Sequence, residues 1–234
     1  MKIRFLGTSH GMENPPSTRN RQSILIEAGD RSFIFDAGAP VYDILKKENY
    51  DFSKVKAVFI SHAHDDHIHY LPELLAAEEL AKAKFYLPDI DTLLEKANTQ
   101  ERDCFKICEG TFYNDLFISV RSVKTRHLVN IEGESISFGF MIEYKGKRIH
   151  ITGDMTDTLE DFPAYLSETK VDMLISEAAH AETDNLFEKL EASNIGTAAL
   201  IHVYPPERYD ELKKRIGKNK FTLILPDDSD EYII

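Results

Sequence analysis

The chain has 234 residues, a formal net charge of -12 and a hydrophobic fraction of 42%. This composition is that of an ordinary globular protein, which buries roughly 70% of its unfolded surface without disulfides or other staples. The acidic balance repels phosphate backbones and anionic lipid headgroups at long range, which disfavours a general nucleic-acid or membrane-surface binder.

The predicted strands of the first half are short and apolar, and they cover residues 2–6, 23–27, 32–35, 55–60 and 84–87. Helical patterns are found at residues 40–48, 70–82 and 89–107. A polar loop with two prolines is expected over residues 11–21. Helices that follow strands in this way predict a sheet covered by helices.

The second half resembles the first. Residues 142–154 mirror residues 26–36, because each segment is a hairpin with an aspartate just past its second strand. Further strands are predicted over 116–123, 171–176 and 198–203. We therefore expect an α/β fold in four layers, an αββα sandwich with two mixed sheets packed face to face and helices outside. It would form a single domain, residues 1–234, built from halves at about 1–110 and 111–234.

The sequence predicts a cytoplasmic protein without a membrane partner. The opening residues 1–7 lack the basic and apolar regions of a signal peptide. No apolar run approaches the ~20 residues of a membrane helix. Cys104 and Cys108 are expected to be free thiols, which fits a reducing compartment.

A cluster of histidines directly follows the predicted strand 55–60. It contains the pattern H-x-H-x-D-H, formed by His62, His64, Asp66 and His67. Histidine and carboxylate ligands suit Zn²⁺, Mn²⁺ or Fe. Because side chains alternate along an extended chain, the first two histidines can point the same way, and the last two groups can face a second ion. The ordered pattern after a buried strand favours a metal site over a solvated histidine-rich loop.

One cluster cannot complete two metal sites, so other segments have to supply ligands. Three candidates stand near the ends of predicted strands: His127, Asp154 and His202. A carboxylate such as that of Asp154 can bridge two cations. Taken singly, each of these residues is as compatible with an ordinary surface or core position as with a metal ligand. Their order and placement together favour metal binding.

This ordered set of seven side chains resembles that of the metallo-β-lactamase superfamily over nearly the whole chain. The resemblance implies that a first metal is bound by His62, His64 and His127. It implies that a second metal is bound by Asp66, His67 and His202, with Asp154 bridging the two. It also implies that Asp36, in Phe35-Asp36-Ala37-Gly38, supports the histidine loop from outside the ligand set.

Within this superfamily, the chain is similar to the phosphodiesterase branch around ribonuclease Z. Four segments carry the likeness: Phe5-Leu6-Gly7-Thr8, Thr18-Arg19-Asn20, Ser176-Glu177-Ala178-Ala179, and His202 followed by Arg208-Tyr209. Two features depart from that branch. Ser176 occupies the position of a histidine in the family's His-Glu-Ala-Thr motif, and the stretch between His67 and His127 is too short for a tRNA-clamping arm. With the acidic charge, these departures disfavour tRNA or other nucleic acid as substrate.

The expected activity is that of a metal-dependent hydrolase acting on a small phosphodiester with two divalent ions. Zinc is the first choice, with Mn or Fe as alternatives. Asp66 is expected to orient the nucleophilic water as well as bind metal. His180 is the candidate proton donor, with a plain surface histidine as the alternative, and Glu177 is expected to support the site. Candidate substrate contacts are Arg19, Tyr204 and Arg208.

Two other functions use the same residues. One is a lactone, ester or thioester hydrolase with the same metal site. The other is a non-catalytic metal-binding module, which the complete ligand set disfavours because a decayed site loses ligands. A homodimer is expected only by analogy with relatives.

Overall fold

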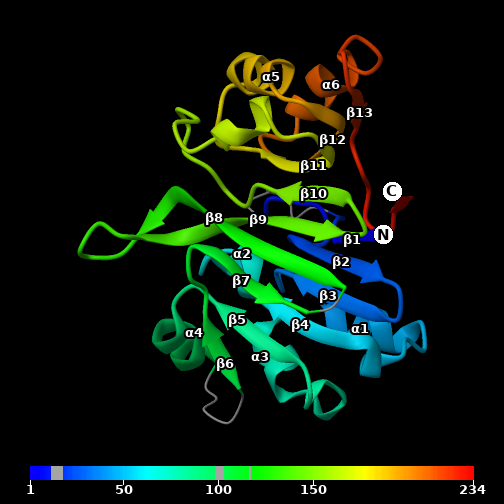
Figure 1. Ribbon diagram of the computed structural model, residues 1–234, viewed down its shortest axis with the longest axis vertical. Helices are drawn as coiled ribbons and strands as arrows, with labels where there is room; N and C mark the ends of the chain where they lie inside the picture. The colour runs from blue at the N-terminus through cyan, green and yellow to red at the C-terminus, as the bar shows by residue number, and fades with distance from the viewer. Residues whose placement is uncertain (12–17, 98–102, 116) are drawn as a thin grey trace. The chain divides into compact units, whose positions relative to one another are not determined.

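The computed structural model describes residues 1–11, 18–97, 103–115 and 117–234 (Figure 1). The described residues form two compact units, each built around one seven-stranded sheet. The first unit contains residues 1–11, 18–97, 103–108 and 227–233, and the second contains residues 109–115, 117–226 and 234. Parts of the predicted loop 11–21 and of the predicted helix 89–107 lie outside the described residues.

The sheet of the first unit is mixed, in the order β14-β1-β2-β3-β4-β5-β6. Its strands are β1 (Lys2–Gly7), β2 (Ser23–Ala28), β3 (Arg31–Phe35), β4 (Val55–Phe59), β5 (Lys84–Leu87), β6 (Cys104–Lys106) and β14 (Glu231–Ile233). Neighbours from β14 to β3 pair antiparallel, whereas neighbours from β3 to β6 pair parallel. The carboxyl ends of β3 and β4 therefore lie at one edge of this sheet.

Short helices connect these strands: α1 (Val41–Lys47), α2 (Asp65–Ile68), α3 (Leu71–Ala76) and α4 (Ile90–Ala97), with 3₁₀ turns at Phe52–Lys54 and Glu78–Leu80. Pro40 precedes α1, where its fixed φ suits a helix start. The predicted helix 70–82 is interrupted at Ala77, whose ψ of 117° is extended. Fully buried aromatic rings fill the core, and the rings of Phe35 and Phe59 pack 5.0 Å apart.

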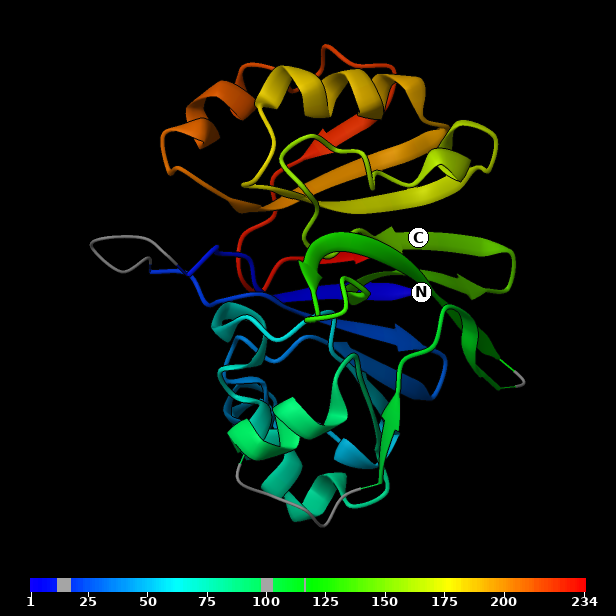
Figure 2. The same cartoon turned by 90° about the vertical axis from the view of Figure 1, so that its left-hand side faces the viewer.

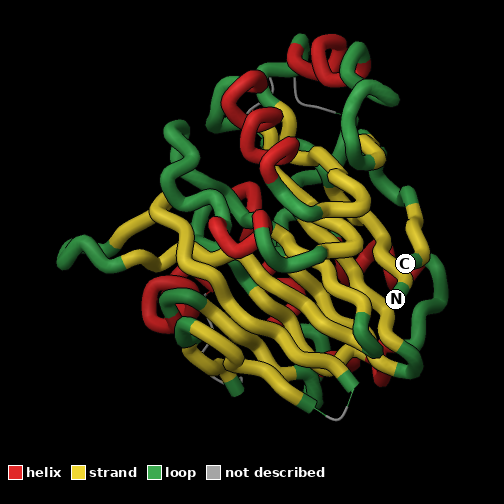
Figure 3. The backbone as a smooth tube through the Cα atoms, turned by 45° about the horizontal axis from the view of Figure 1, so that its top comes forward, coloured by secondary structure: helices red, strands yellow, loops and turns green. Residues whose placement is uncertain are grey.

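The sheet of the second unit is also mixed, in the order β13-β12-β11-β10-β9-β8-β7. Its strands are β7 (Gly110–Asn114), β8 (Ile118–Val129), β9 (Ser135–Tyr144), β10 (Lys147–Ile151), β11 (Val171–Ala178), β12 (Ile195–Val203) and β13 (Thr222–Ile224). The strands β7 to β10 form an antiparallel meander, and β10 to β13 pair parallel. Figure 3 shows the long two-stranded ribbon of β8 and β9.

Two helices cover the parallel part of this second sheet. The helix α5 (Thr183–Ala192) connects β11 to β12, and α6 (Arg208–Lys213) follows β12. Figures 1 and 2 show both helices on the same face of the sheet. The buried side chains of Leu186, Phe187 and Leu190 on α5 pack into the core cluster that includes Leu174 and Leu200. None of the described helices is long and apolar enough to cross a membrane.

The predicted α/β class with two mixed sheets is confirmed. Two predicted elements differ. Residues 104–106 form the edge strand β6 instead of continuing a helix, and β8 runs on to Val129, so His127 lies within that strand. The last strand, β14, pairs with β1 and therefore belongs to the first unit.

Candidate metal centre

The first ligand cluster, His62, His64, Asp66 and His67, lies in the loop and short helix that follow β4. Asp36 follows the neighbouring parallel strand β3, and its backbone N–H donates to the Phe59 carbonyl at 2.8 Å. Asp36 is 2% exposed. Its carboxylate accepts two hydrogen bonds from Ser61, one from the backbone N–H at 2.7 Å and one from the hydroxyl at 3.0 Å. Asp36 thus fixes the start of the ligand loop through Ser61.

The hydrogen bonds of Asp36 and Ser61 determine which nitrogen of each buried imidazole is left for a metal. An ionised carboxylate only accepts, so the contact of 2.9 Å from His67 Nδ1 to Asp36 Oδ2 places the proton on Nδ1. The Ser61 hydroxyl gives its only proton to Asp36, so it accepts from His62 Nδ1 at 3.0 Å. Both histidines therefore keep the Nε2 lone pair as a ligand.

The spacing within this cluster fits metal ions. His62 Nε2 lies 3.1 Å from His64 Nδ1, and His67 Nε2 lies 4.0 Å from Asp66 Oδ2. Ligands at about 2.1 Å from a tetrahedral zinc lie roughly 3.4 Å from one another. The cluster therefore offers one pair of donors to each of two cations.

The loop after β3 holds the backbone of the ligand loop at very close range. The Ala37 N–H donates to the His67 carbonyl at 2.7 Å, and the Tyr70 N–H donates to the Ala37 carbonyl at 2.8 Å. A Cβ atom at Gly38 would lie 1.8 Å from the Asp66 carbonyl oxygen. Only glycine fits this approach, which accounts for the glycine in the Phe35-Asp36-Ala37-Gly38 segment.

Asp65, the cluster's remaining acid, is turned away from the predicted ligands. Its carboxylate pairs with Arg21 and lies 3.2 Å from His69 Nδ1. Burial alone would raise the pKa of Asp65, but the His69 and Arg21 contacts outweigh it and lower that pKa below its ordinary value. Asp65 is therefore an ion-pair partner outside the ligand set.

The second ligand cluster consists of His127, Asp154 and His202 in the second unit. Since β8 and β10 both run antiparallel to β9, and β10 to β12 are parallel, all the strands that carry these residues end at one edge. Asp154 is 3% exposed. His127 Nε2 lies 3.6 Å from its Oδ2, and His202 Nδ1 lies 3.7 Å from its Oδ1. Each carboxylate oxygen thus faces a different imidazole, as a bridging carboxylate requires.

A β-bulge directs His202 toward Asp154. The register between β11 and β12 shifts after Glu177 and Ile201, so that Ala178 pairs with Val203 and His202 is the extra residue. His202 has φ of 55°, a left-handed conformation that costs energy for a residue with a side chain. A bulge re-aims a side chain at the end of a strand.

His180 joins this cluster through the turn after β11. Its Nε2 lies 3.9 Å from Asp154 Oδ2, and its ring centroid is 4.5 Å from that of His127. The Glu177 carboxylate accepts the backbone N–H groups of Ala179 at 2.6 Å and His180 at 3.1 Å, and it lies 3.4 Å from His180 Nδ1. Glu177 therefore fixes the backbone of the turn that carries His180.

Of the three predicted substrate contacts, Arg208 and Arg19 have structural partners within the protein. Arg208 Nη1 donates to the carbonyls of Ala178, Ala179 and Ala181 at 2.8 to 2.9 Å, which closes the turn that carries His180. Arg19 forms an ion pair with Asp227. Tyr204 directly follows the bulged segment and is partly buried. Their contacts with substrate stay predictions.

No sequence pattern distinguishes Ser61, although its hydroxyl fixes the proton of His62 on Nδ1. The signal was its position between a buried strand and the first ligand. A serine is common at strand ends, so only the contact with Asp36 distinguishes it.

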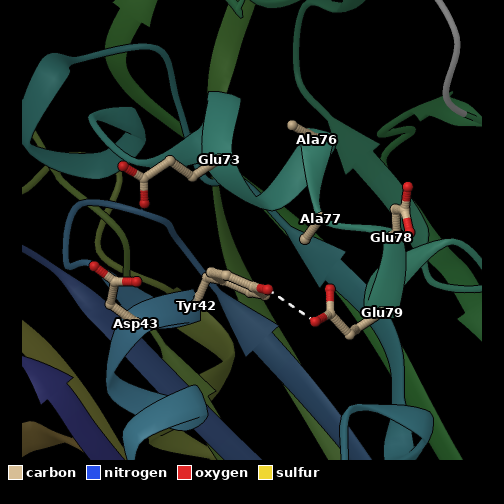
Figure 4. Close-up of a pocket in the computed structure, with 7 residues that line it drawn as sticks. All are labelled: Tyr42, Asp43, Glu73, Ala76, Ala77, Glu78 and Glu79. Carbon is tan, nitrogen blue, oxygen red and sulfur yellow. Dashed lines mark hydrogen bonds between the residues drawn. The ribbon is translucent and has the colours of Figure 1, made fainter.

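A separate hollow of about 520 Å³ lies on the first unit beside α1 and α3. Figure 4 shows its lining, in which Tyr42 donates a hydrogen bond to Glu79 at 2.8 Å and Asp43 and Glu73 add carboxylates. These negative charges repel a phosphate group. The hollow is therefore a poor site for an anionic substrate, and the ligand clusters are the better candidates.

Sequence comparisons match the first part of the chain. Residues 1–89 match the family described as "Anti-Pycsar protein Apyc1". Ribonuclease Z of Prochlorococcus marinus (strain MIT 9301) is 42% identical over 78 residues, which are 32% of this chain and 24% of that protein. Ribonuclease Z of the strain NATL1A is 39% identical over 83 residues, 35% of this chain and 26% of that protein. The matches thus span about a quarter of the length of these curated relatives.

Solved structures match the whole chain. The metallo-β-lactamase fold protein YhfI from Bacillus subtilis has a TM-score of 0.79 and 20% identity, covering 99% of this chain and 98% of its own. The short form of human tRNase Z has a TM-score of 0.75 and 21% identity, covering 100% and 99%. Zn²⁺-bound PqqB from Methylobacterium extorquens has a TM-score of 0.72 and 16% identity, covering 100% of both chains.

The chain therefore has the metallo-β-lactamase fold. The predicted resemblance to this superfamily and to its ribonuclease Z branch is confirmed, and the similar proteins include tRNase Z and ribonuclease Z.

Proposed function

We propose that this protein is a metal-dependent hydrolase that cleaves a small phosphodiester with the help of two divalent cations. The observation that carries the proposal is the fixed proton position in the first ligand cluster. Asp36 and Ser61 leave the Nε2 lone pairs of His62 and His67 for metal. Hydrogen bonds of this kind behind metal-binding histidines set the ring orientation and raise ligand basicity.

The seven predicted ligands divide between the two ions as the superfamily resemblance implies. His62, His64 and His127 would hold one ion. Asp66, His67 and His202 would hold the other, and Asp154 would contact both. The two imidazoles that face the separate oxygens of Asp154 support this division. Zinc is the first choice because a protein of the same fold, PqqB, is Zn²⁺-bound.

Two bound cations supply a water of lowered pKa and stabilise the negative charge that develops on the substrate. The protein's own side chains do the rest. Asp66 lies at the rim of the first cluster, where its carboxylate can orient the attacking water. His180, whose backbone N–H donates to Glu177 and whose Nδ1 lies 3.4 Å from that carboxylate, would donate a proton from its imidazolium form to the leaving oxygen.

The substrate is proposed to be small. The likeness to ribonuclease Z favours a phosphodiester over a carboxylic ester. The net charge of -12 opposes the approach of a long polyanion. A cytoplasmic location and a homodimer stay predictions.

Hydrolysis of bis-p-nitrophenyl phosphate, compared with a lactone and p-nitrophenyl acetate in the presence of Zn²⁺ or Mn²⁺, tests this function. We expect phosphodiester turnover, and a loss of at least ~100-fold in kcat for Asp66→Asn and for His180→Ala, because each removes a group that acts on a proton or on the nucleophile. The matched control Asp65→Asn changes the neighbouring acid and should keep the wild-type rate. Turnover of the lactone alone would refute the phosphodiester proposal.

A further inference from the structure

The loop that follows β1 is fixed in place beside the first ligand cluster. The Thr8 hydroxyl donates to Asp228 Oδ1 at 2.9 Å, and the Asn20 backbone N–H donates to the other oxygen of Asp228. The Ser9 N–H donates to the Asn20 carbonyl at 2.9 Å. The half-buried carboxylate of Asp228 thus holds two segments of the chain together, and His10 lies two residues after Thr8. Its backbone is therefore positioned before any ligand binds.

His10 and Gly11 lie against the predicted metal ligand Asp66. A Cβ atom at Gly11 would lie 2.8 Å from the Asp66 Cβ, so the backbone approaches more closely than any other residue type allows. A side-chain nitrogen of His10 and a carboxylate oxygen of Asp66 lie within 4.8 Å of each other. His10 is partly buried, and its Nδ1 atom is buried. The imidazole is thus held next to a carboxylate that is itself proposed to bind metal.

The chemistry of this pair suits a cation. Imidazole is the commonest metal ligand among protein side chains, and carboxylate and imidazole together suit zinc or manganese. Two ligands each about 2.1 Å from one ion can be up to about 4.2 Å apart, so a small movement of either side chain lets both bind the same ion. Zinc in catalytic sites also accepts a fifth ligand.

We propose that His10 is a further ligand of the metal ion that Asp66 binds. This proposal rests on the dinuclear centre proposed above and adds an eighth residue to its ligand set. His10 and Asp66 come from separate segments of the first unit. The ion would therefore tie the loop after β1 to the ligand loop after β4.

Titration of Co²⁺ into the metal-free full-length protein, followed by calorimetry and visible absorption, tests the proposal. The wild type should bind two ions. In His10→Ala one ion should keep its affinity, while the other should bind at least about 10-fold more weakly and show an altered absorption spectrum. The control is His69→Ala, which removes an imidazole from the same unit that contacts Asp65 instead. It should bind both ions as the wild type does.

The outcomes separate this proposal from the proposed function. Two ions bound to His10→Ala with wild-type affinity and spectrum, even with reduced turnover, would overturn the ligand role of His10 and leave the hydrolase proposal standing. A wild type that binds no Co²⁺, Zn²⁺ or Mn²⁺ would overturn both. The metal-free unfolding temperature of each variant must equal that of the metal-free wild type. If His10→Ala fails this check, His10→Gln replaces it with the same expected results.

Discussion

At the scale of single residues, the candidate site depends on hydrogen bonds that decide where protons lie. The carboxylate of Asp36 receives three contacts on two oxygens, from the Ser61 N–H, the Ser61 hydroxyl and His67 Nδ1. Only a group that accepts at both oxygens satisfies all three donors. The tautomers of His62 and His67 therefore depend on one acid that touches no metal in the proposed centre.

Asp36→Asn should weaken metal binding. Asparagine has a single acceptor oxygen, so at least one buried donor loses its partner and the proton on His67 is no longer fixed. We expect metal affinity to fall about 10- to 100-fold and the free energy of unfolding to fall by about 1–3 kcal/mol. Calorimetric metal titration and urea denaturation measure both. Asp65→Asn is the control, and an Asp36→Asn protein with unchanged affinity would contradict the tautomer assignment.

His150 is a buried histidine of β10 that no ligand cluster includes. It is 0% exposed and lies 2.9 Å from the Tyr165 hydroxyl through Nδ1. Burial, with a smaller effect of Arg121, lowers the pKa of His150 from 6.5 to about 3. Burial also raises the pKa of Tyr165 to about 12. Both groups are therefore neutral in the folded protein at physiological pH.

This depressed pKa predicts a loss of stability in acid. Below pH 6.5 the unfolded chain binds a proton at His150 that the folded protein does not bind until about pH 3. The free energy of unfolding should therefore fall by up to ~1.4 kcal/mol per pH unit across this window from this group alone. Urea denaturation of metal-free protein from pH 7 to pH 4 should show a shallower fall for His150→Gln. Equal slopes for the wild type and the variant would disprove this, and His69→Gln serves as the exposed control.

At the scale of elements, the site is built where strands end. The parallel pairing of β3 with β4, of β10 with β11 and of β11 with β12 brings residues from distant parts of the sequence to one edge of each sheet. The backbone of the turn after β11 is held by hydrogen bonds from side chains of other residues. Arg208 of α6 donates to three of its carbonyls, and Glu177 accepts two of its N–H groups.

Arg208→Met should loosen this turn. It removes charge-assisted hydrogen bonds to the carbonyls of Ala178, Ala179 and Ala181 while keeping an apolar stem. We expect a loss of about 1.5–3 kcal/mol in stability and a larger fall in kcat than in metal affinity, because His180 is displaced while most ligands stay in place. Denaturation and steady-state kinetics test this. Lys213→Met, which alters an exposed side chain of the same helix, should change neither. A change in KM or in metal affinity without a fall in kcat would contradict the proposed role of Arg208 in holding the turn of His180.

Much of the element order could be predicted because hydrophobic patterns reflect local burial. The strands β2, β3 and β4 are mostly buried, and each carries a short apolar run. The strand β6 could not be predicted, because Cys104–Lys106 is three residues long and its strand character comes from pairing with β5. The bulge at His202 also depends on a neighbour, the register of β11.

At the scale of the whole molecule, the predicted metal ligands belong to both units of the chain. The set of seven ligands, which comprises His62, His64, Asp66, His67, His127, Asp154 and His202, stays a prediction from their sequence order and the superfamily resemblance. The supporting contacts of Ser61 and the orientation of His180 could not be predicted, since they depend on side-chain directions that no local pattern encodes. The net charge of -12 further favours binding of cations by the folded chain.

Counting bound metal tests the central claim most directly. Purified protein should be loaded with Zn²⁺ or Mn²⁺, freed of excess metal by gel filtration and analysed by mass spectrometry for metal per chain. The account predicts two ions per wild-type chain and at most one in Asp154→Asn, whose second carboxylate oxygen is lost. Less than one ion per wild-type chain after loading would contradict the proposal that these side chains form a dinuclear metal centre.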